Sequence, residues 1–263
     1  MATLPMGCGR RSKAPSGSDE RVDLEKVAPI AAWPISPAKP QPLPRYPWDW
    51  RWQSPLPIGR YHFRCKGSSL RPRRQAAVAG GDPLFDCDGE MLSHSLPLFE
   101  GEEGVYPCLI ELLNYLQAKT GRAVVITSGH RCPSHNTYID SSVENQVSKH
   151  QIGAAVDFYM EGYENSPEKL IELIGDYYRE QPEWKGDTAF FPLQRWTKES
   201  HGVSCQPWYN RELFIKLYRA DEGRNDDNCH PWPYLSLQVR WDRLRRERVE
   251  YSWKRAFYGY YRF

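Results

Sequence analysis

A histidine and an aspartate seven residues apart, His150 and Asp157, have side chains whose types and spacing could do chemistry together. Imidazole nitrogen and carboxylate oxygen are both ligands of zinc. In an extended segment, residues of odd separation face opposite sides, so a pair serving one site needs a turn between them, which Gly153 can supply. Asp157 lies in an apolar run, where a carboxylate is costly unless it binds a cation or hydrogen-bond donors. The pair therefore fits a metal site, although spacing alone fits a surface histidine and a capping aspartate equally well.

A second polar segment, Ser128–Asn136, follows the short apolar run 123–127. Functional side chains commonly lie on a loop at the end of a buried strand. The guanidinium fork of Arg131 in this segment suits a peptide carboxylate. A surface salt bridge is the alternative role for Arg131.

The two segments together resemble a known family. Residues 148–157 read Ser-x-His-x-x-Gly-x-Ala-x-Asp, and residues 128–136 read Ser-Gly-His-Arg-x-x-x-x-Asn. Both are similar to segments of the M15 zinc peptidases, the D-alanyl-D-alanine carboxypeptidase and endolysin group, in which Tyr or Phe is usual where His130 stands. The resemblance covers roughly residues 105–242. It implies an α+β fold of the hedgehog/DD-peptidase type, with a small antiparallel sheet and flanking helices, and zinc-dependent cleavage of bacterial peptidoglycan stem peptides.

The resemblance also implies roles for single residues. It makes His150 and Asp157 zinc ligands, gives Arg131 a catalytic and substrate-holding role, and lets Ser148 position the substrate or the metal pair. A catalytic zinc has three protein ligands and one open position for water. The family supplies its third ligand as a histidine on a late strand, preceded three residues earlier by an acidic general base.

The third ligand is where this sequence departs from the family pattern. Alignment by strands puts Ser236 in place of the zinc histidine and Gln238 in place of the aspartate that follows it. Alignment by the base-x-x-His signature instead selects Asp227 as general base and His230 as ligand. The two registers are not interchangeable unless the connection before the strand folds back, which Pro231 and Pro233 could enforce. The third ligand is left open, and a catalytically inactive M15-like cell-wall binding or structural protein is the alternative to a peptidase.

The remaining histidines and the cysteines carry weaker signals. We expect His130, His135 and His201 to be polar scaffolding. The seven cysteines are odd in number and scattered, without a C-x-x-C pair, so they predict neither a disulfide framework nor a structural zinc site. One bridge, for example between Cys65 and Cys87, could form in an exported protein.

Composition bounds the partners and the location. The net charge of +2 is too balanced to indicate a nucleic-acid binder, and no apolar run of eighteen residues could span a membrane. The sequence start lacks the apolar stretch of a secretory signal. We therefore expect a cytoplasmic protein or, if the true start lies upstream, a periplasmic or cell-envelope one.

The chain divides into a Pro-rich segment, 1–54, which we expect to be disordered, and an M15-like domain, 55–263, with a basic aromatic tail. Apolar spacing predicts helices at 105–119 and from 166 to 178. Short apolar runs predict the following strands: 123–127, 213–218, 234–241, and one or two around 61–65. Residues 181–209 are expected to be loop.

Overall fold

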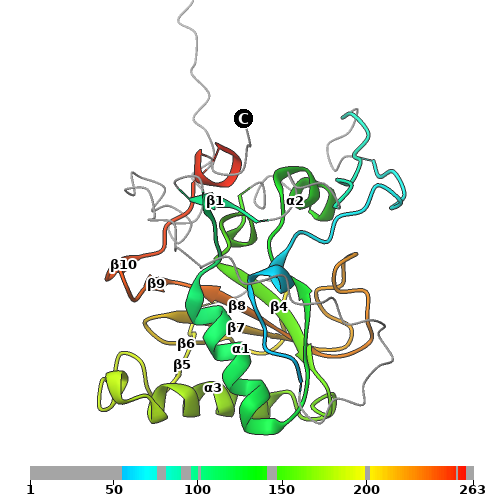
Figure 1. Cartoon of the computed structure of the whole chain (residues 1–263). Coiled ribbons are helices and arrows are strands. Elements are labelled where there is room, and N and C mark those ends of the chain that lie inside the picture. Colours follow the sequence, from blue (N-terminus) through cyan, green and yellow to red (C-terminus); the bar gives the residue numbers. More distant parts are fainter. Residues whose placement is uncertain are drawn as a thin grey trace, which may run out of the picture.

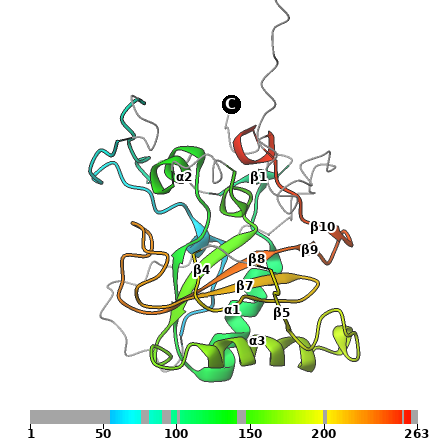
Figure 2. The ribbon, with the colours of Figure 1, turned by 180° about the vertical axis from the view of Figure 1, so that it is seen from behind.

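The computed structural model describes residues 55–75, 81–89, 96–99, 102–140, 147–198, 202–252 and 254–258. The segment 1–54 lies outside the described residues, so its expected disorder and the domain boundary near residue 55 stay predictions. The described chain is an α+β fold built on one six-stranded antiparallel sheet (Figures 1 and 2). The expected fold class is confirmed.

The strands of the main sheet lie in the order β3-β4-β8-β7-β6-β5. Their bounds are β3 Val124–Ser128, β4 Ala155–Met160, β5 Gln194–Arg195, β6 Trp208–Tyr209, β7 Leu213–Tyr218 and β8 Tyr234–Val239. Two small hairpins add β1 Leu98–Phe99 with β2 Glu102–Glu103, and β9 Trp241–Asp242 with β10 Glu247–Arg248. The helices are α1 Pro107–Thr120, α2 Pro133–Ile139 and α3 Glu168–Glu180, with short helical turns η1 Arg60–Phe63, η4 Lys149–Ile152, η5 Pro182–Trp184 and η6 Lys254–Tyr258.

Helix α1 covers one face of the sheet, in front of it in Figure 1 and behind it in Figure 2. Pro107 suits the first turn of α1, because an N–H at this position would have no acceptor within the helix. The helix ends at Gly121, whose φ of 64° is left-handed. Leucines at three- and four-residue spacing are buried against the sheet and α3: Leu109, Leu112, Leu113 and Leu116. Truncating one of them to alanine should cost about 2–5 kcal/mol.

The opposite face of the sheet carries a row of polar side chains across four strands. Ser128 of β3 pairs with Asp157 of β4, Asp157 pairs with Ser236 of β8, and Ser236 pairs with Lys216 of β7. Cross-strand partners project from the same face of a sheet. Since the residues alternating with this row belong to the apolar core, the polar row lies on the face away from α1.

The structure confirms the two predicted helices and the strands at 123–127, 213–218 and 234–241 within a few residues. The strand expected around 61–65 is wrong, because Arg60–Phe63 form a 3-10 turn. Helix α2 lies where only a loop was expected, and it begins after Cys132, whose sulfur accepts a hydrogen bond from the N–H of His135. The stretch 181–209, expected to be loop, contains the short turn η5 and the two-residue strands β5 and β6, of which β5 is the edge strand of the sheet.

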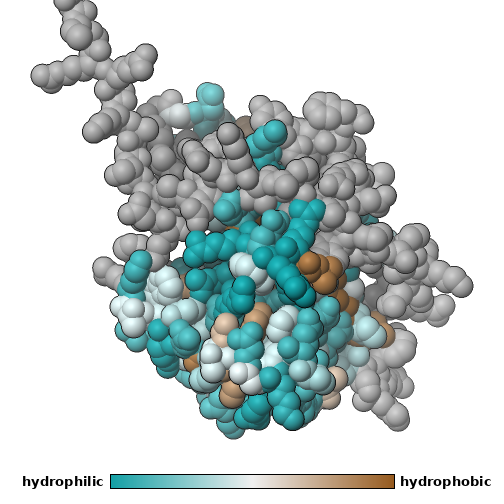
Figure 3. All heavy atoms as spheres, turned by 90° about the vertical axis from the view of Figure 1, so that its left-hand side faces the viewer, coloured by the Kyte–Doolittle hydropathy of each residue, from teal (hydrophilic) through white to brown (hydrophobic). Residues whose placement is uncertain are grey.

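No helix in the described part of the chain has the length and apolar character needed to cross a membrane. The face at the left of Figure 1, where β5 and β6 lie, is mostly hydrophilic with a small apolar area (Figure 3). Arg195 of β5 stacks over the ring of Trp208 at 3.6 Å from its centroid, and Arg211 stacks over Trp241 at 4.0 Å. Guanidinium groups therefore cover aromatic rings of β6 and β9.

Candidate active site

His150 is positioned by a short capped turn. The hydroxyl of Ser148 accepts a hydrogen bond from the N–H of His150 at 3.3 Å, and Gln151 accepts one from the N–H of Ser148 at 2.7 Å. The turn ends at Gly153, with φ of 66°, where a Cβ would lie 3.0 Å from the carbonyl oxygen of Gly104. The expected turn between His150 and β4 is therefore present, and the structure gives Ser148 a capping contact.

The turn brings His150 and Asp157 together. His150 Nδ1 donates to the carbonyl oxygen of Gly129 at 2.6 Å, so Nε2 carries the lone pair. Nε2 lies 3.5 Å from Asp157 Oδ1, a buried oxygen without a hydrogen-bond partner among the described residues. Two ligands each about 2.0–2.2 Å from one zinc ion have a similar separation. The pair therefore has the tautomer, the free oxygen and the spacing that a shared metal ion requires.

The other oxygen of Asp157 is held by two donors. Oδ2 accepts hydrogen bonds from Asn228 Nδ2 at 3.0 Å and from Arg131 Nη2 at 3.4 Å. Burial alone would raise the pKa of Asp157, but His150, Arg131 and the Ser236 hydroxyl together lower it. Asp157 is therefore charged at neutral pH.

The connection between β7 and β8 folds back over the polar face of the sheet. Arg224 organises it by donating to four carbonyl oxygens: those of Asn228 at 3.3 Å and His230 at 2.8 Å from Nη1, and those of Arg219 at 2.6 Å and Trp232 at 3.0 Å from Nη2. The fold-back that the base-x-x-His register needs is therefore present. A guanidinium, rather than the prolines alone, holds it.

The fold-back places His230 on the same face as Asp157 but not against it. The His230 ring packs on Tyr159 with centroids 4.7 Å apart and on Tyr234 at 5.7 Å. Both of its ring nitrogens are buried without a hydrogen-bond partner among the described residues. Burial, reinforced by Arg224, lowers the pKa of His230, so the ring is neutral as a metal ligand must be. Within the described part of the chain, its nitrogens do not join His150 and Asp157 in a group whose atoms all lie within 4.8 Å.

Asp227 lies in a charged network. Its carboxylate accepts from Ser128 Oγ at 2.7 Å and His135 Nε2 at 3.0 Å, and pairs with Arg131 Nε and Arg71 Nη1 at 3.3 Å each. Burial would raise the pKa of Asp227, but His135, Arg131 and Ser128 hold it well below its usual range. A carboxylate this acidic is a weak proton acceptor.

Arg131 lies between the two carboxylates and is only 8% exposed. Its Nε donates to Ser128 Oγ at 2.9 Å. The guanidinium is therefore fixed in one orientation beside the His150 and Asp157 pair.

Ser236 lies directly opposite Asp157 on β8, and Gln238 lies opposite Ala155. A serine therefore faces Asp157 across the two strands, and the choice between the two alignments stays open. The residues selected by the two alignments, Ser236 on β8 and His230 in the folded connection, lie on the same face of the sheet.

Asn228 is a site residue that sequence reasoning missed. Besides donating to Asp157, its side chain accepts from Thr127 Oγ1 at 2.5 Å. Nothing in the sequence marks this residue, because its partners are distant along the chain and meet it only after the connection folds back.

Residues 94–175 match the family model described as Peptidase M15, and this range contains both motifs of the site. No curated protein and no solved structure matches the chain.

Proposed function

We propose that this chain, which belongs to the peptidase M15 family through residues 94–175, is a zinc-dependent peptidase that acts on bacterial peptidoglycan stem peptides in the manner of a D-alanyl-D-alanine carboxypeptidase. One observation carries the proposal: His150 Nε2 faces the buried, unpartnered Oδ1 of Asp157 at 3.5 Å. A buried carboxylate oxygen without a donor is costly unless a cation satisfies it.

Three side chains would hold the metal. His150 Nε2 and Asp157 Oδ1 fit it as they stand, and His230 offers a neutral ring on the same face. His230 reaches the pair only if the Arg224-held connection shifts toward β4. When bound, zinc would polarise the scissile carbonyl and lower the pKa of a bound water to about 7.

Arg131 would hold the substrate. Its guanidinium lies beside the ligand pair, where it can meet a peptide carboxylate or a developing negative charge. Asp227 and Ser128 keep this orientation without substrate. The general-base role of Asp227 stays a prediction, and its hydrogen bonds support a second role, the positioning of Arg131.

The test combines zinc content with hydrolysis of a peptide ending in D-alanyl-D-alanine. Wild-type protein should cleave the peptide, and His150→Ala should abolish cleavage and release the metal of this site. His62→Ala is the matched control, because His62 is exposed and its ring hydrogen-bonds to the backbone of the neighbouring Gly59. A zinc-replete wild-type protein that binds no metal through His150 and leaves the peptide intact would contradict the proposal.

A second candidate function, an inactive cell-wall binding protein of M15 fold, is supported by Ser236. A serine opposite Asp157 is a poor substitute for imidazole, and Arg131 already pairs with the Asp157 carboxylate. This candidate predicts that the purified chain sediments with peptidoglycan and releases no amino acid from it. Cleavage that depends on His150 would exclude it.

A further inference from the structure

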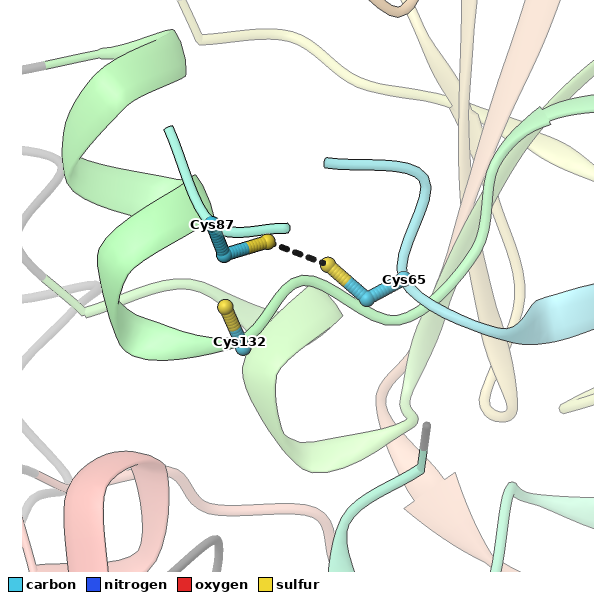
Figure 4. A group of neighbouring side chains, drawn as sticks. All are labelled: Cys65, Cys87 and Cys132. Carbon is cyan, nitrogen blue, oxygen red and sulfur yellow. Dashed lines mark hydrogen bonds between the residues drawn. The ribbon is translucent and has the colours of Figure 1, made fainter. Parts of the chain in front are cut away.

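Three cysteines from segments far apart in the sequence meet at one point. Cys65 follows η1, Cys87 lies in the described segment 81–89, and Cys132 precedes α2. Their sulfur atoms all lie within 4.8 Å of one another, and the three side chains point toward a common centre (Figure 4). All three residues are buried, with at most 6% exposed.

The sulfur separation suits a metal better than a disulfide. Cys65 Sγ and Cys87 Sγ are 3.7 Å apart, whereas a disulfide bond is about 2.05 Å long. Two thiolates about 2.3 Å from a tetrahedral zinc ion are separated by about 3.8 Å. Cys132 Sγ also accepts a hydrogen bond from the N–H of His135 at 3.3 Å, which would stabilise a thiolate.

We propose that Cys65, Cys87 and Cys132 bind a structural zinc ion, with His135 Nδ1 as the fourth ligand. The ligand atoms of Asp86, Cys87 and His135 also lie within 4.8 Å of one another, so the histidine adjoins the cysteine cluster. Three cysteines and one histidine are a common closed set for structural zinc.

The hydrogen bonds of His135 favour this fourth ligand. Its Nε2 lies 3.0 Å from Asp227 Oδ1, and a metal-bound histidine usually donates its other N–H to a carboxylate. Its Nδ1 now shares a proton with Asp86 Oδ1 at 2.7 Å. Zinc would take the place of that proton.

Gly67 shows that the backbone closes around the cluster. A Cβ at Gly67 would lie 2.0 Å from Cys87 Sγ, 2.8 Å from Asp86 Oδ1 and 3.1 Å from His135 Nδ1. No side chain fits at this position without displacing a proposed ligand.

The consequence is a clamp on a segment with little regular structure. Between η1 and residue 89, the described residues form only one isolated β-bridge, Arg74 with Leu84. Cys65 and Cys87 would tie this segment to α2 beside Arg131. Through His135 and Asp227, the clamp would also support the guanidinium of the active site without providing any ligand to it.

Zinc K-edge X-ray absorption of the full-length protein, purified in reductant from zinc-supplemented cells, tests the proposal. We expect a first shell with sulfur at about 2.3 Å, which the His150 and Asp157 site cannot supply. The sulfur shell should disappear in Cys65→Ser and persist in the matched control Cys205→Ser. It should also persist in His150→Ala, so failure of the peptidase proposal leaves this result unchanged.

Two outcomes would overturn the site. One is a wild-type spectrum without zinc–sulfur scattering, which decides the matter even if the variants do not fold. The other is a Cys65–Cys87 disulfide in protein purified with zinc but without reductant, detected by peptide mass after alkylation without reduction. An unchanged nitrogen contribution in His135→Gln would overturn the assignment of the fourth ligand.

Discussion

The two candidate metal groups differ in how the chain brings them together. His150 and Asp157 belong to one ten-residue motif, yet in space they form only a pair. The cysteine cluster has no motif, yet its three sulfurs already lie at metal-binding distances. A sequence motif therefore shows which residues share a turn, whereas a complete ligand set can depend on contacts between distant segments.

The largest expected effect comes from breaking the pair. Asp157→Asn removes the charge that faces His150 and Arg131 and leaves the buried guanidinium short of a partner. We expect hydrolysis to fall to background and the free energy of unfolding to drop by about 3–5 kcal/mol. Peptide cleavage and urea denaturation measure the two effects. Asp221→Asn, at an exposed position, is the control, and an Asp157→Asn variant of full activity would remove Asp157 from the ligands.

Asp227→Asn tests the contact between the two regions, since Asp227 binds both His135 and Arg131. Loss of its buried charge should lower the free energy of unfolding by about 3 kcal/mol while the zinc–sulfur shell remains. Denaturation and X-ray absorption on the same preparation measure this. Lost hydrolysis at unchanged stability would instead identify Asp227 as the general base.

Metal removal should affect the cysteine region first. Chelation under reducing conditions should lower the free energy of unfolding by roughly 3 kcal/mol if free zinc had been a few hundred times the Kd. The drop should persist in His150→Ala, which keeps the cysteine cluster, as followed by thermal denaturation. A drop confined to wild-type protein would place the stabilising metal at His150 instead.

A glycine substitution gives a smaller and more local effect. Gly67→Ala puts a methyl group 2.0 Å from Cys87 Sγ and should cost about 1–3 kcal/mol, with weaker zinc retention. Gly59→Ala is the matched control, because a Cβ there has nothing within 4 Å. Equal stability of the two variants would mean that the cluster is looser than its geometry indicates.

Thiol labelling should show the smallest effect, a change in the reactivity of single cysteines. Cys229 is exposed and should react in the native protein, whereas burial raises the pKa of the Cys108 thiol well above its usual value and should keep it unreactive. Chelation should make Cys65 and Cys132 reactive and leave Cys108 protected. Mass spectrometry of alkylated peptides measures the labelling of each cysteine. If the labelling of Cys65 is the same with and without the chelator, the result would argue against bound zinc.

Much of the scaffold could be predicted from the sequence, because its signals are local. Leucine spacing in α1 and the capped turn before β4 are encoded within about fifteen residues. The placement of His230 could not be predicted, since it depends on Arg224 binding four carbonyl oxygens after the connection folds back. The cysteines looked scattered because their common point lies between three loops, and the strand expected near Cys65 was wrong because η1 replaces it.

The pairing of Ser236 with Asp157 across β4 and β8 has an evolutionary consequence. A histidine at position 236 would start from a backbone already in register with an existing carboxylate, so one substitution could add an imidazole to this row. Ser236→His is thus the shortest mutational path between a two-ligand and a three-ligand version of the same sheet. Parallel zinc titrations of Ser236→His and wild-type protein would show how much zinc affinity the added imidazole contributes.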